Sequence, residues 1–282
     1  MSEAKVKRGL IETPDGHLHY REDGLGAPLL LLHQVPLSSL EFSAVQPRLA
    51  QTGRRVIAAD LLGYGCSDAP SRGLTIEDYA VSIIHLMDGL GLARTDLLGV
   101  HTGAAVANAV AANFPERVGK LILNGAPAWP DWQTHYAMLA RCQPFELDAE
   151  GASIKEQWER LRRYTDDVHL IRRFIGEKLK AGPIWYPGYV AVFTHDFIST
   201  FARVHAQTLL LTGSLDMLAE CSALLKRCRP DLTDVIIEGG GNWLALEHPG
   251  RFVEEVTRFL ADQANSNDPT SSREKLHENP SP

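Results

Sequence analysis

The sequence of 282 residues lacks the features of several protein classes. Its four cysteines are too few for a disulfide framework and contain no C-x-x-C pair, which favours free thiols in a reducing compartment. No apolar stretch approaches the roughly 18 residues that span a bilayer, and the charged N-terminus lacks the apolar core of a signal peptide. We therefore expect a cytoplasmic protein without a membrane partner.

Positive charge is also scarce. The formal net charge at pH 7 is -7 and no cluster of lysine or arginine stands out, which argues against nucleic acid as a partner. No histidine, cysteine and acidic residues have the spacing of a zinc site, and no glycine-rich phosphate-binding pattern follows a predicted strand. The sequence thus predicts no metal and no cofactor. A small-molecule substrate is the expected partner, and a homodimer is compatible with the sequence.

Apolar segments alternate with helical patterns along most of the chain. The segment GLIETPDGHLHYREDG predicts a β-hairpin that turns at Asp15 and Gly16. The later runs PLLLLH, RRVIAADLLG, DLLGV, KLILNGA, TLLLTGSLD and DVIIEGGG predict strands buried on both faces. Because helical segments separate these runs, we expect an α/β fold with a mostly parallel central sheet flanked by helices.

The alternation stops in the middle of the chain and again near its end. Residues 128–203 have helical spacing and many aromatic side chains, which predicts a helical lid inserted between two strands. Residues 1–127 and 204–262 then form the core. The polar segment 263–282 has too few apolar residues to offset the entropy of ordering it, so we expect a disordered tail.

Five motifs follow the predicted strands in a fixed order: HQVPLSS, DLLGYGCSD, GVHTG, GSLD and GGGNWLALEHPGRF. The first is similar to H-G-x-P-x-S and the second to D-x-x-G-x-G-x-S-D. Over about residues 10–262 the chain resembles the α/β-hydrolase fold, in particular the branch that contains epoxide hydrolases and dehalogenases. The resemblance implies this fold with an inserted lid, but it leaves the reaction open because the fold hosts many chemistries.

The resemblance places the nucleophile of the family on His101, where a serine, aspartate or cysteine is usual. The acid position falls on Asp216, and the position of the catalytic histidine falls on Asn242. Placing His248 at that position instead leaves the preceding glycine run unmatched. Two of the three triad positions are therefore changed, and a conventional serine hydrolase is not expected.

The same resemblance implies an oxyanion hole made by the backbone N–H groups of Val35 and Thr102. Gln34 stands where the family has glycine, so its side chain must find a polar partner or enter the site. His33 is expected to support this loop structurally.

Aromatic residues of the lid and of the last motif are expected to bind substrate: Trp129, Tyr186, Tyr189 and Trp243. The basic face of the lid segment ERLRRY is interpreted as solvated.

An imidazole at the tip of this turn is a good proton acceptor near neutral pH. We expect the Asn242 amide to bridge His101 and Asp216 in a relay. Such a site fits proton abstraction by a lyase, isomerase or cyclase, or hydrolysis by water that His101 activates, on a small apolar substrate with a carbonyl, ester or hydroxyl group. The alternative is an inactive homologue that binds a ligand or partner. A bulky histidine at a strained turn favours the enzyme.

Overall fold

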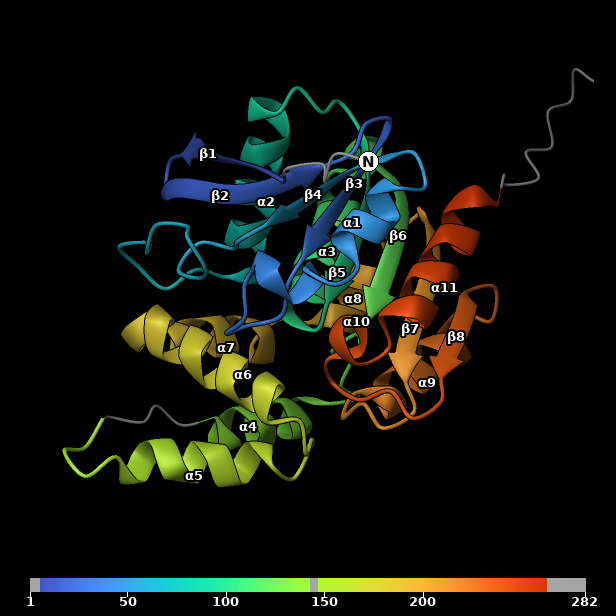
Figure 1. Ribbon diagram of the computed structural model, residues 1–282. Helices are drawn as coiled ribbons and strands as arrows, with labels where there is room; N and C mark the ends of the chain where they lie inside the picture. The colour runs from blue at the N-terminus through green and yellow to red at the C-terminus, as the bar shows by residue number, and fades with distance from the viewer. Residues whose placement is uncertain (1–5, 143–146, 263–282) are drawn as a thin grey trace, which may run out of the picture.

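Eight strands form one sheet in the order β1-β2-β4-β3-β5-β6-β7-β8 (Figure 1). The computed structural model describes residues 6–142 and 147–262. The strands are β1 (Lys7–Thr13), β2 (Gly16–Asp23), β3 (Ala27–Leu32), β4 (Arg54–Ala59), β5 (Thr95–Val100), β6 (Val118–Asn124), β7 (Gln207–Gly213) and β8 (Thr233–Ile237).

Helices separate the strands from β3 onward and follow β8. The α-helices are α1 (Gln46–Ala50), α2 (Ile76–Gly89), α3 (Thr102–Asn113), α4 (Trp132–Arg141), α5 (Ala152–Leu161), α6 (Val168–Ala181), α7 (Trp185–Phe193), α8 (Phe197–Phe201), α9 (Ala219–Cys228), α10 (Leu244–Glu247) and α11 (Pro249–Ala261). The short 3-10 helices are η1 (Ser39–Phe42), η2 (Pro115–Arg117) and η3 (Gly182–Ile184).

The pairing of the strands confirms the predicted sheet. The hairpin of β1 and β2 is antiparallel, and β2 also pairs with β4 in an antiparallel arrangement. From β4 to β8 every neighbouring pair is parallel, which is the arrangement that alternating strands and helices produce. The structure therefore shows a mostly parallel sheet flanked by helices.

Both faces of the sheet are buried over the central strands β4, β3, β5, β6 and β7, as their continuous apolar segments require. The edge strand β8 is not buried on both faces as expected, since Ile236 is 61% exposed where no further strand or helix of the described chain covers it. Along β3, Leu30 and Leu32 point into a core shared with α2 and α3, whereas Leu29 and Leu31 point into a core shared with α1 and α11. This alternation follows from the two-residue period of a strand. It explains why β3 is leucine on both faces rather than alternately apolar and polar.

The helices between β6 and β7 gather at the carboxyl ends of the strands, where Figure 1 shows α4, α5, α6 and α7 below the sheet. We call residues 128–203 the lid. Lid residues Leu161 and Phe174 pack against Leu37 and Trp243, which follow β3 and β8. This apolar contact stabilises the position of the lid over the carboxyl edge of the sheet.

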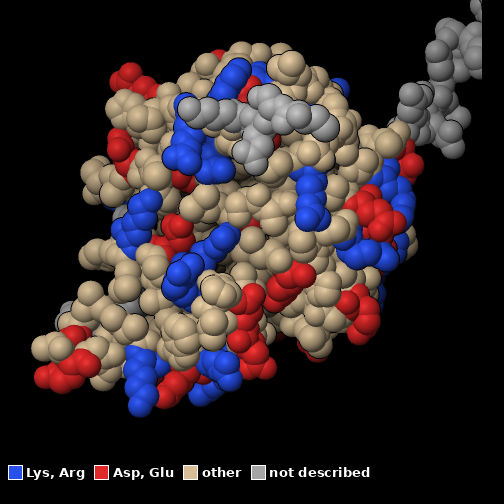
Figure 2. Space-filling view, in the orientation of Figure 1, with Lys and Arg blue, Asp and Glu red and all other residues tan. Residues whose placement is uncertain are grey.

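The molecular surface has a mixed charge distribution. On the face shown in Figure 2, acidic and basic side chains are interspersed. No helix in the described ranges is both long and apolar enough to cross a membrane. All four cysteines are free thiols. The predicted tail, 263–282, lies outside the described residues.

The turn from β5 to α3 depends on a close approach between backbones. A Cβ atom on Gly99 would overlap the backbone oxygen of Gly103, and a Cβ on Gly103 would overlap the backbone oxygen of Leu32. Both neighbours are backbone atoms and cannot move aside as a flexible side chain can. Only glycine therefore fits these two positions.

We expect Gly103→Ala to lower the free energy of unfolding by about 1–3 kcal/mol, because the added methyl group overpacks α3 against β3. Gly176→Ala is the matched control, since a Cβ at that helical position meets nothing within 4 Å, and it should raise stability by up to about 1 kcal/mol. Urea unfolding midpoints at an unchanged m-value measure both. Wild-type stability of Gly103→Ala would contradict the close approach.

Candidate functional site

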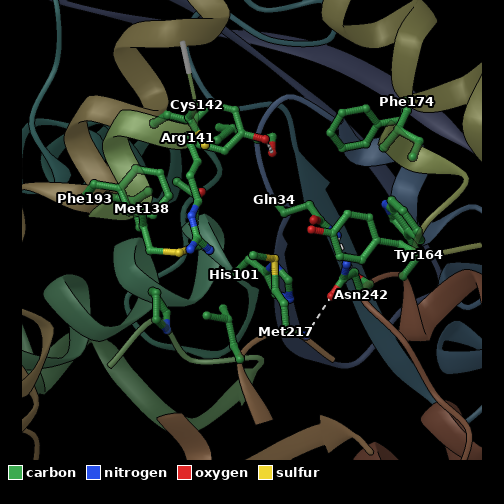
Figure 3. Close-up of a pocket in the computed structure, with 18 of the residues that line it drawn as sticks. Gln34, His101, Met138, Arg141, Cys142, Tyr164, Phe174, Phe193, Met217 and Asn242 are labelled. Carbon is green, nitrogen blue, oxygen red and sulfur yellow. Dashed lines mark hydrogen bonds between the residues drawn. The ribbon is translucent and has the colours of Figure 1, made fainter. Parts of the chain in front are cut away.

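A cavity of about 410 Å³ lies between the carboxyl ends of the strands and the lid (Figure 3). Its core side is formed by residues that follow β3, β5, β6, β7 and β8, and its other side by lid residues. The lining residues are Gln34, Val35, His101, Thr102, Pro127, Trp129, Met138, Arg141, Cys142, Arg160, Leu161, Arg163, Tyr164, Phe174, Tyr189, Val192, Phe193, Met217, Leu218, Asn242 and Trp243.

His101 stands at the tip of the turn between β5 and α3 in a conformation that side chains rarely adopt. Its φ of 45° and ψ of -106° make it the only residue other than glycine with positive φ in the described ranges. The backbone is held on both sides, because its N–H donates to Asn124 O at 2.9 Å and its carbonyl accepts from Ala105 N at 3.1 Å. Such strain costs of order 1–3 kcal/mol and is typical of functional sites.

The imidazole of His101 contacts Asp216 directly. Nε2 lies 3.0 Å from Asp216 Oδ2, and the other carboxylate oxygen accepts from Leu218 N at 2.8 Å. Burial disfavours the charged imidazolium, but the charge and hydrogen bond of Asp216, together with the charge of Glu41, outweigh this effect. The pKa of His101 therefore lies above its ordinary value of 6.5.

Gly125 leaves the space that this pair occupies. A Cβ at this position would lie 2.5 Å from Cδ2 and 2.6 Å from Nε2 of His101, and 2.9 Å from Asp216 Oδ2. Gly125 also has a φ of +61°, at the end of β6. Any side chain here would displace the imidazole from the carboxylate. Sequence reasoning missed this role, although the glycine directly after a buried strand was its signal.

Asn242 does not bridge His101 and Asp216, so the predicted relay through its amide is wrong. Its Oδ1 accepts instead from Met217 N at 3.0 Å, which fixes the loop after β7. An imidazole reaches farther from the turn than a serine hydroxyl would, so the carboxylate of Asp216 meets it without an intermediary. Asn242 still lines the cavity.

Gln34 has found its polar partner in Glu41, a buried residue that the sequence did not single out. Gln34 N donates to Glu41 Oε2 at 3.0 Å, and Gln34 Nε2 donates to Glu41 Oε1 at 2.7 Å and to Asn242 O at 2.9 Å. Burial raises the pKa of Glu41 to about 7 against the effect of these hydrogen bonds. Both hydrogens of the amide are committed, so its Oε1 is the part of Gln34 that can accept a hydrogen bond from a ligand.

Val35 and Thr102 line the cavity together with His101, and their backbone N–H groups are the predicted oxyanion hole. Within the described part of the chain neither donates a hydrogen bond. Thr102 is the first residue of α3, where the helix presents unpaired N–H groups and partial positive charge. Tyr189 Oη donates to Val35 O at 3.3 Å and so connects the lid to this loop.

His33 supports the same loop from beneath, as expected. Its Nδ1 lies 2.8 Å from Gln34 O, and its Nε2 accepts from Leu61 N at 2.9 Å. The side chain is fully buried and does not line the cavity. Its hydrogen bonds are structural.

Three of the four predicted substrate-binding residues line the cavity: Trp129, Tyr189 and Trp243. The prediction for Tyr186 is not met, because it is absent from the described lining and packs against the main core.

The basic face of the lid is exposed to solvent at Arg162 and Arg163, as expected, but it also borders the cavity. Arg160 and Arg163, from the segment ERLRRY, line the cavity together with Arg141 at the end of α4. Sequence reasoning missed these residues because a basic helical face looks the same whether it borders water or a cavity.

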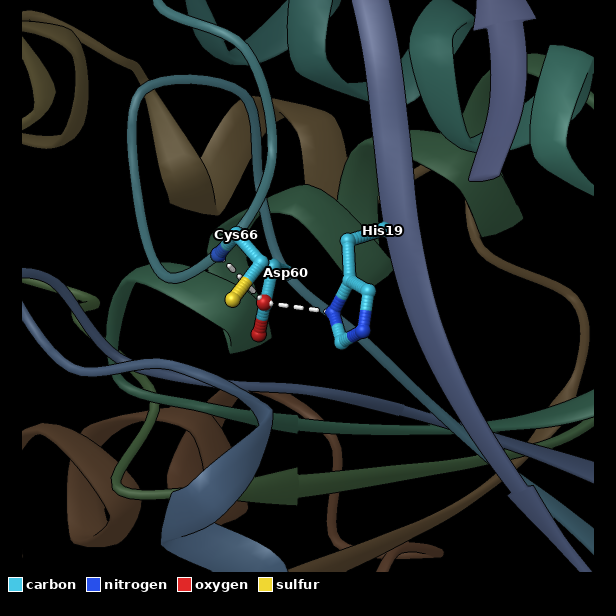
Figure 4. Close-up of side chains that lie close together, drawn as sticks. All are labelled: His19, Asp60 and Cys66. Atoms are coloured by element: carbon cyan, nitrogen blue, oxygen red, sulfur yellow. Dashed lines mark hydrogen bonds and ion pairs between the residues drawn. The ribbon is translucent and has the colours of Figure 1, made fainter. Parts of the chain in front are cut away.

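His19, Asp60 and Cys66 form another cluster outside the lined cavity (Figure 4). Asp60 Oδ2 accepts from Cys66 N and lies 2.8 Å from His19 Nδ1, while Oδ1 accepts from Ser39 N. Burial opposes ionisation, but these hydrogen bonds and the charge of His33 lower the pKa of Asp60 to about 2. Both carboxylate oxygens are thus engaged in joining β2 to two loops, which is a structural role.

Comparison with known proteins identifies the fold family. A family model described as alpha/beta hydrolase fold matches residues 27–249. The chain is 26% identical over 271 residues to 2-hydroxymuconate semialdehyde hydrolase of Pseudomonas sp. (strain CF600), covering 86% of this chain and 89% of that protein. It is also 26% identical over 254 residues to 2-(acetamidomethylene)succinate hydrolase of Mesorhizobium japonicum, covering 86% and 91%.

Among solved structures, a hydrolase from Pseudomonas aeruginosa PA01 superposes with a TM-score of 0.77 at 23% identity, covering 91% of this chain and 99% of that one. This likeness supports the fold alone. Since the family model spans most of the sequence, the chain belongs to the alpha/beta hydrolase fold family.

Proposed function

We propose that this protein is a cofactor-independent enzyme in which His101, oriented by Asp216, is the general base, and that it hydrolyses a small carbonyl-bearing substrate. His101 then replaces the nucleophile of the family, and Asn242 replaces the family histidine. The observation that carries the proposal is the direct contact of Nε2 with Asp216 Oδ2 beneath a cavity, at the strained tip of the turn.

The contact with Asp216 determines which ring nitrogen of the neutral His101 carries the proton. When Nε2–H donates to the carboxylate, the lone pair of the imidazole is on Nδ1, and no described residue donates to that atom. Nδ1 can therefore take a proton from water while the water oxygen bonds to the substrate carbonyl carbon. The carbonyl oxygen becomes negative and is stabilised by the N–H groups of Val35 and Thr102. The intermediate then expels its leaving group, which takes the proton back from Nδ1.

The cavity offers no conventional nucleophile in place of His101. No serine occurs among its described lining residues, and the thiol there belongs to Cys142. Burial raises the pKa of Cys142, so the thiol stays protonated near neutral pH and is a weak nucleophile. Water activated by the imidazole is the nucleophile that remains.

The names of the curated relatives support hydrolysis, since both are called hydrolases. A lyase or isomerase would use Nδ1 on a C–H bond next to the carbonyl, and the same amides would stabilise the enolate. Gln34 Oε1 can accept a hydrogen bond from a substrate hydroxyl group. It favours a lyase or isomerase only if the substrate carries a hydroxyl group next to this oxygen. An inactive ligand-binding protein would show no turnover that depends on His101.

We expect no covalent adduct when the wild-type protein is incubated with a fluorophosphonate probe, because the site has no activated serine. The double variant His101→Ser with Asn242→His should be labelled at residue 101, since it restores a hydroxyl and a base at the two changed positions. Mass spectrometry of the intact and digested proteins detects the adduct. A labelled serine in the wild type would contradict the proposal.

Turnover of a panel of small esters and 1,3-diketones, followed by product analysis, tests the base itself. We expect His101→Ala to lower kcat/KM by about 100-fold or more, the usual contribution of general-base catalysis. His169→Ala is the matched control, because His169 lies exposed on α6 away from the cavity. Unchanged turnover in His101→Ala would refute the role of the imidazole.

The activity should fall as the pH decreases. The base must be unprotonated, and the pKa of His101 is raised above 6.5, so kcat/KM should lose activity below an apparent pKa higher than that value. Asp216→Asn removes the negative charge that favours the protonated imidazole. In this variant kcat/KM should therefore begin to fall only at a lower pH, while its maximal value at high pH decreases. If Asp216→Asn does not change the pH at which kcat/KM falls, the titrating group is not His101 but another group, such as Glu41.

A further inference from the structure

Three arginines of the lid line the cavity; Arg141 and Arg163 are also exposed to solvent, whereas Arg160 is partly buried. Arg141 ends α4, Arg160 lies in the last turn of α5, and Arg163 follows that helix. Figure 3 shows Arg141 directed into the cavity toward Met138 and His101. Positive charge is therefore concentrated on the side of the cavity opposite the strand ends.

No carboxylate neutralises these arginines within the described part of the chain. The described lining of the cavity includes neither aspartate nor glutamate, and no ion pair is formed by any of the three. Other arginines differ: Arg162 pairs with Asp166 at 3.1 Å, on the same segment as Arg160 and Arg163. The cavity arginines are thus set apart from their immediate neighbours by the absence of a partner acid.

A neutral side chain of the lid, rather than a carboxylate, accepts a hydrogen bond from Arg160. Gln157 Oε1 accepts from Arg160 Nη2 at 2.6 Å and from Lys178 Nζ at 2.9 Å. An amide oxygen orients two cations without cancelling either charge. Burial, followed by the charge of Arg160, lowers the pKa of the buried Lys178 to about 7, which reflects the positive field at this place.

Arginines that border one cavity without a partner acid attract an anion, and the attraction is strongest beside the partly buried Arg160. The planar guanidinium fork matches a carboxylate in two parallel hydrogen bonds. The rest of the lid wall is apolar, with Trp129, Phe174 and Phe193, and the volume of about 410 Å³ suits a short carbon skeleton.

We propose that Arg141, Arg160 and Arg163 bind a carboxylate group of the substrate, so that the protein acts on a small carboxylic acid. This inference rests on the proposed function, which places the reacting carbonyl at His101. The acid group then lies on the lid side and the carbonyl on the strand side of one cavity. The substrate is amphipathic rather than wholly apolar.

Calorimetric titration of the full-length protein at low ionic strength tests the inference with three probes: succinate, its neutral dimethyl ester, and inorganic phosphate. We expect succinate to bind, the ester to bind much more weakly, and added salt to weaken succinate binding. Arg141→Gln, Arg160→Gln and Arg163→Gln should each weaken it about tenfold, as expected for loss of a charge-assisted hydrogen bond.

The chain supplies matched controls. Arg162→Gln removes the neighbouring arginine that pairs with Asp166 and should leave succinate affinity unchanged. Gln157→Glu, of nearly the same shape, introduces a carboxylate between Arg160 and Lys178 and should weaken binding as the arginine variants do. Thermal unfolding of each variant confirms that it is folded.

His101→Ala separates the two proposals, because it should lower turnover by about 100-fold or more but keep succinate binding. Succinate affinity that is indifferent to all three arginine variants, or equal affinity for the dimethyl ester, would overturn the carboxylate site while leaving general-base catalysis intact. Tighter binding of phosphate with the same dependence on the arginines would also overturn it, in favour of a phosphorylated ligand.

Discussion

The contact between the imidazole of His101 and the carboxylate of Asp216 is the interaction on which the site depends. It requires a histidine backbone in a strained conformation, and the strain is tolerated because both neighbouring peptide groups are hydrogen bonded. It also requires empty space, which Gly125 provides beside the ring, and a tight turn, which Gly99 and Gly103 provide. Glycines on three segments therefore serve a single pair of side chains.

Charge is distributed unevenly around this pair. Beneath it, Glu41 is buried against the amide of Gln34 and has a pKa near neutrality, so its ionisation and that of His101 influence each other. On the lid side, Arg141 and Arg160 border the cavity without a compensating carboxylate among the described residues. The base thus lies between an acidic group on the core side and basic groups on the lid side. A substrate with one anionic end would be oriented by this arrangement before any bond changes.

The family provides the scaffold, and the residues at the tip of the turn decide what chemistry the scaffold supports. The sheet and the turn position are those of the alpha/beta hydrolase fold. In the proposed mechanism the catalytic imidazole occupies the nucleophile position itself, whereas in the family it lies beside the nucleophile. In this proposal the N–H groups of Val35 and Thr102 stabilise negative charge on oxygen with either arrangement, so that one fold can accommodate both.

The sequence by itself determined the strands, the parallel sheet, the turn at His101 and the acid at Asp216, because periodicity and short motifs are local properties of the chain. Only the tertiary structure decided which groups meet. It placed Asp216 on His101 without Asn242 between them, buried Glu41 against Gln34, and turned Arg160 toward a cavity. Such contacts join residues up to 208 positions apart, as between Gln34 and Asn242. Their geometry depends on how loops at the sheet edge pack, which no local pattern in the sequence specifies.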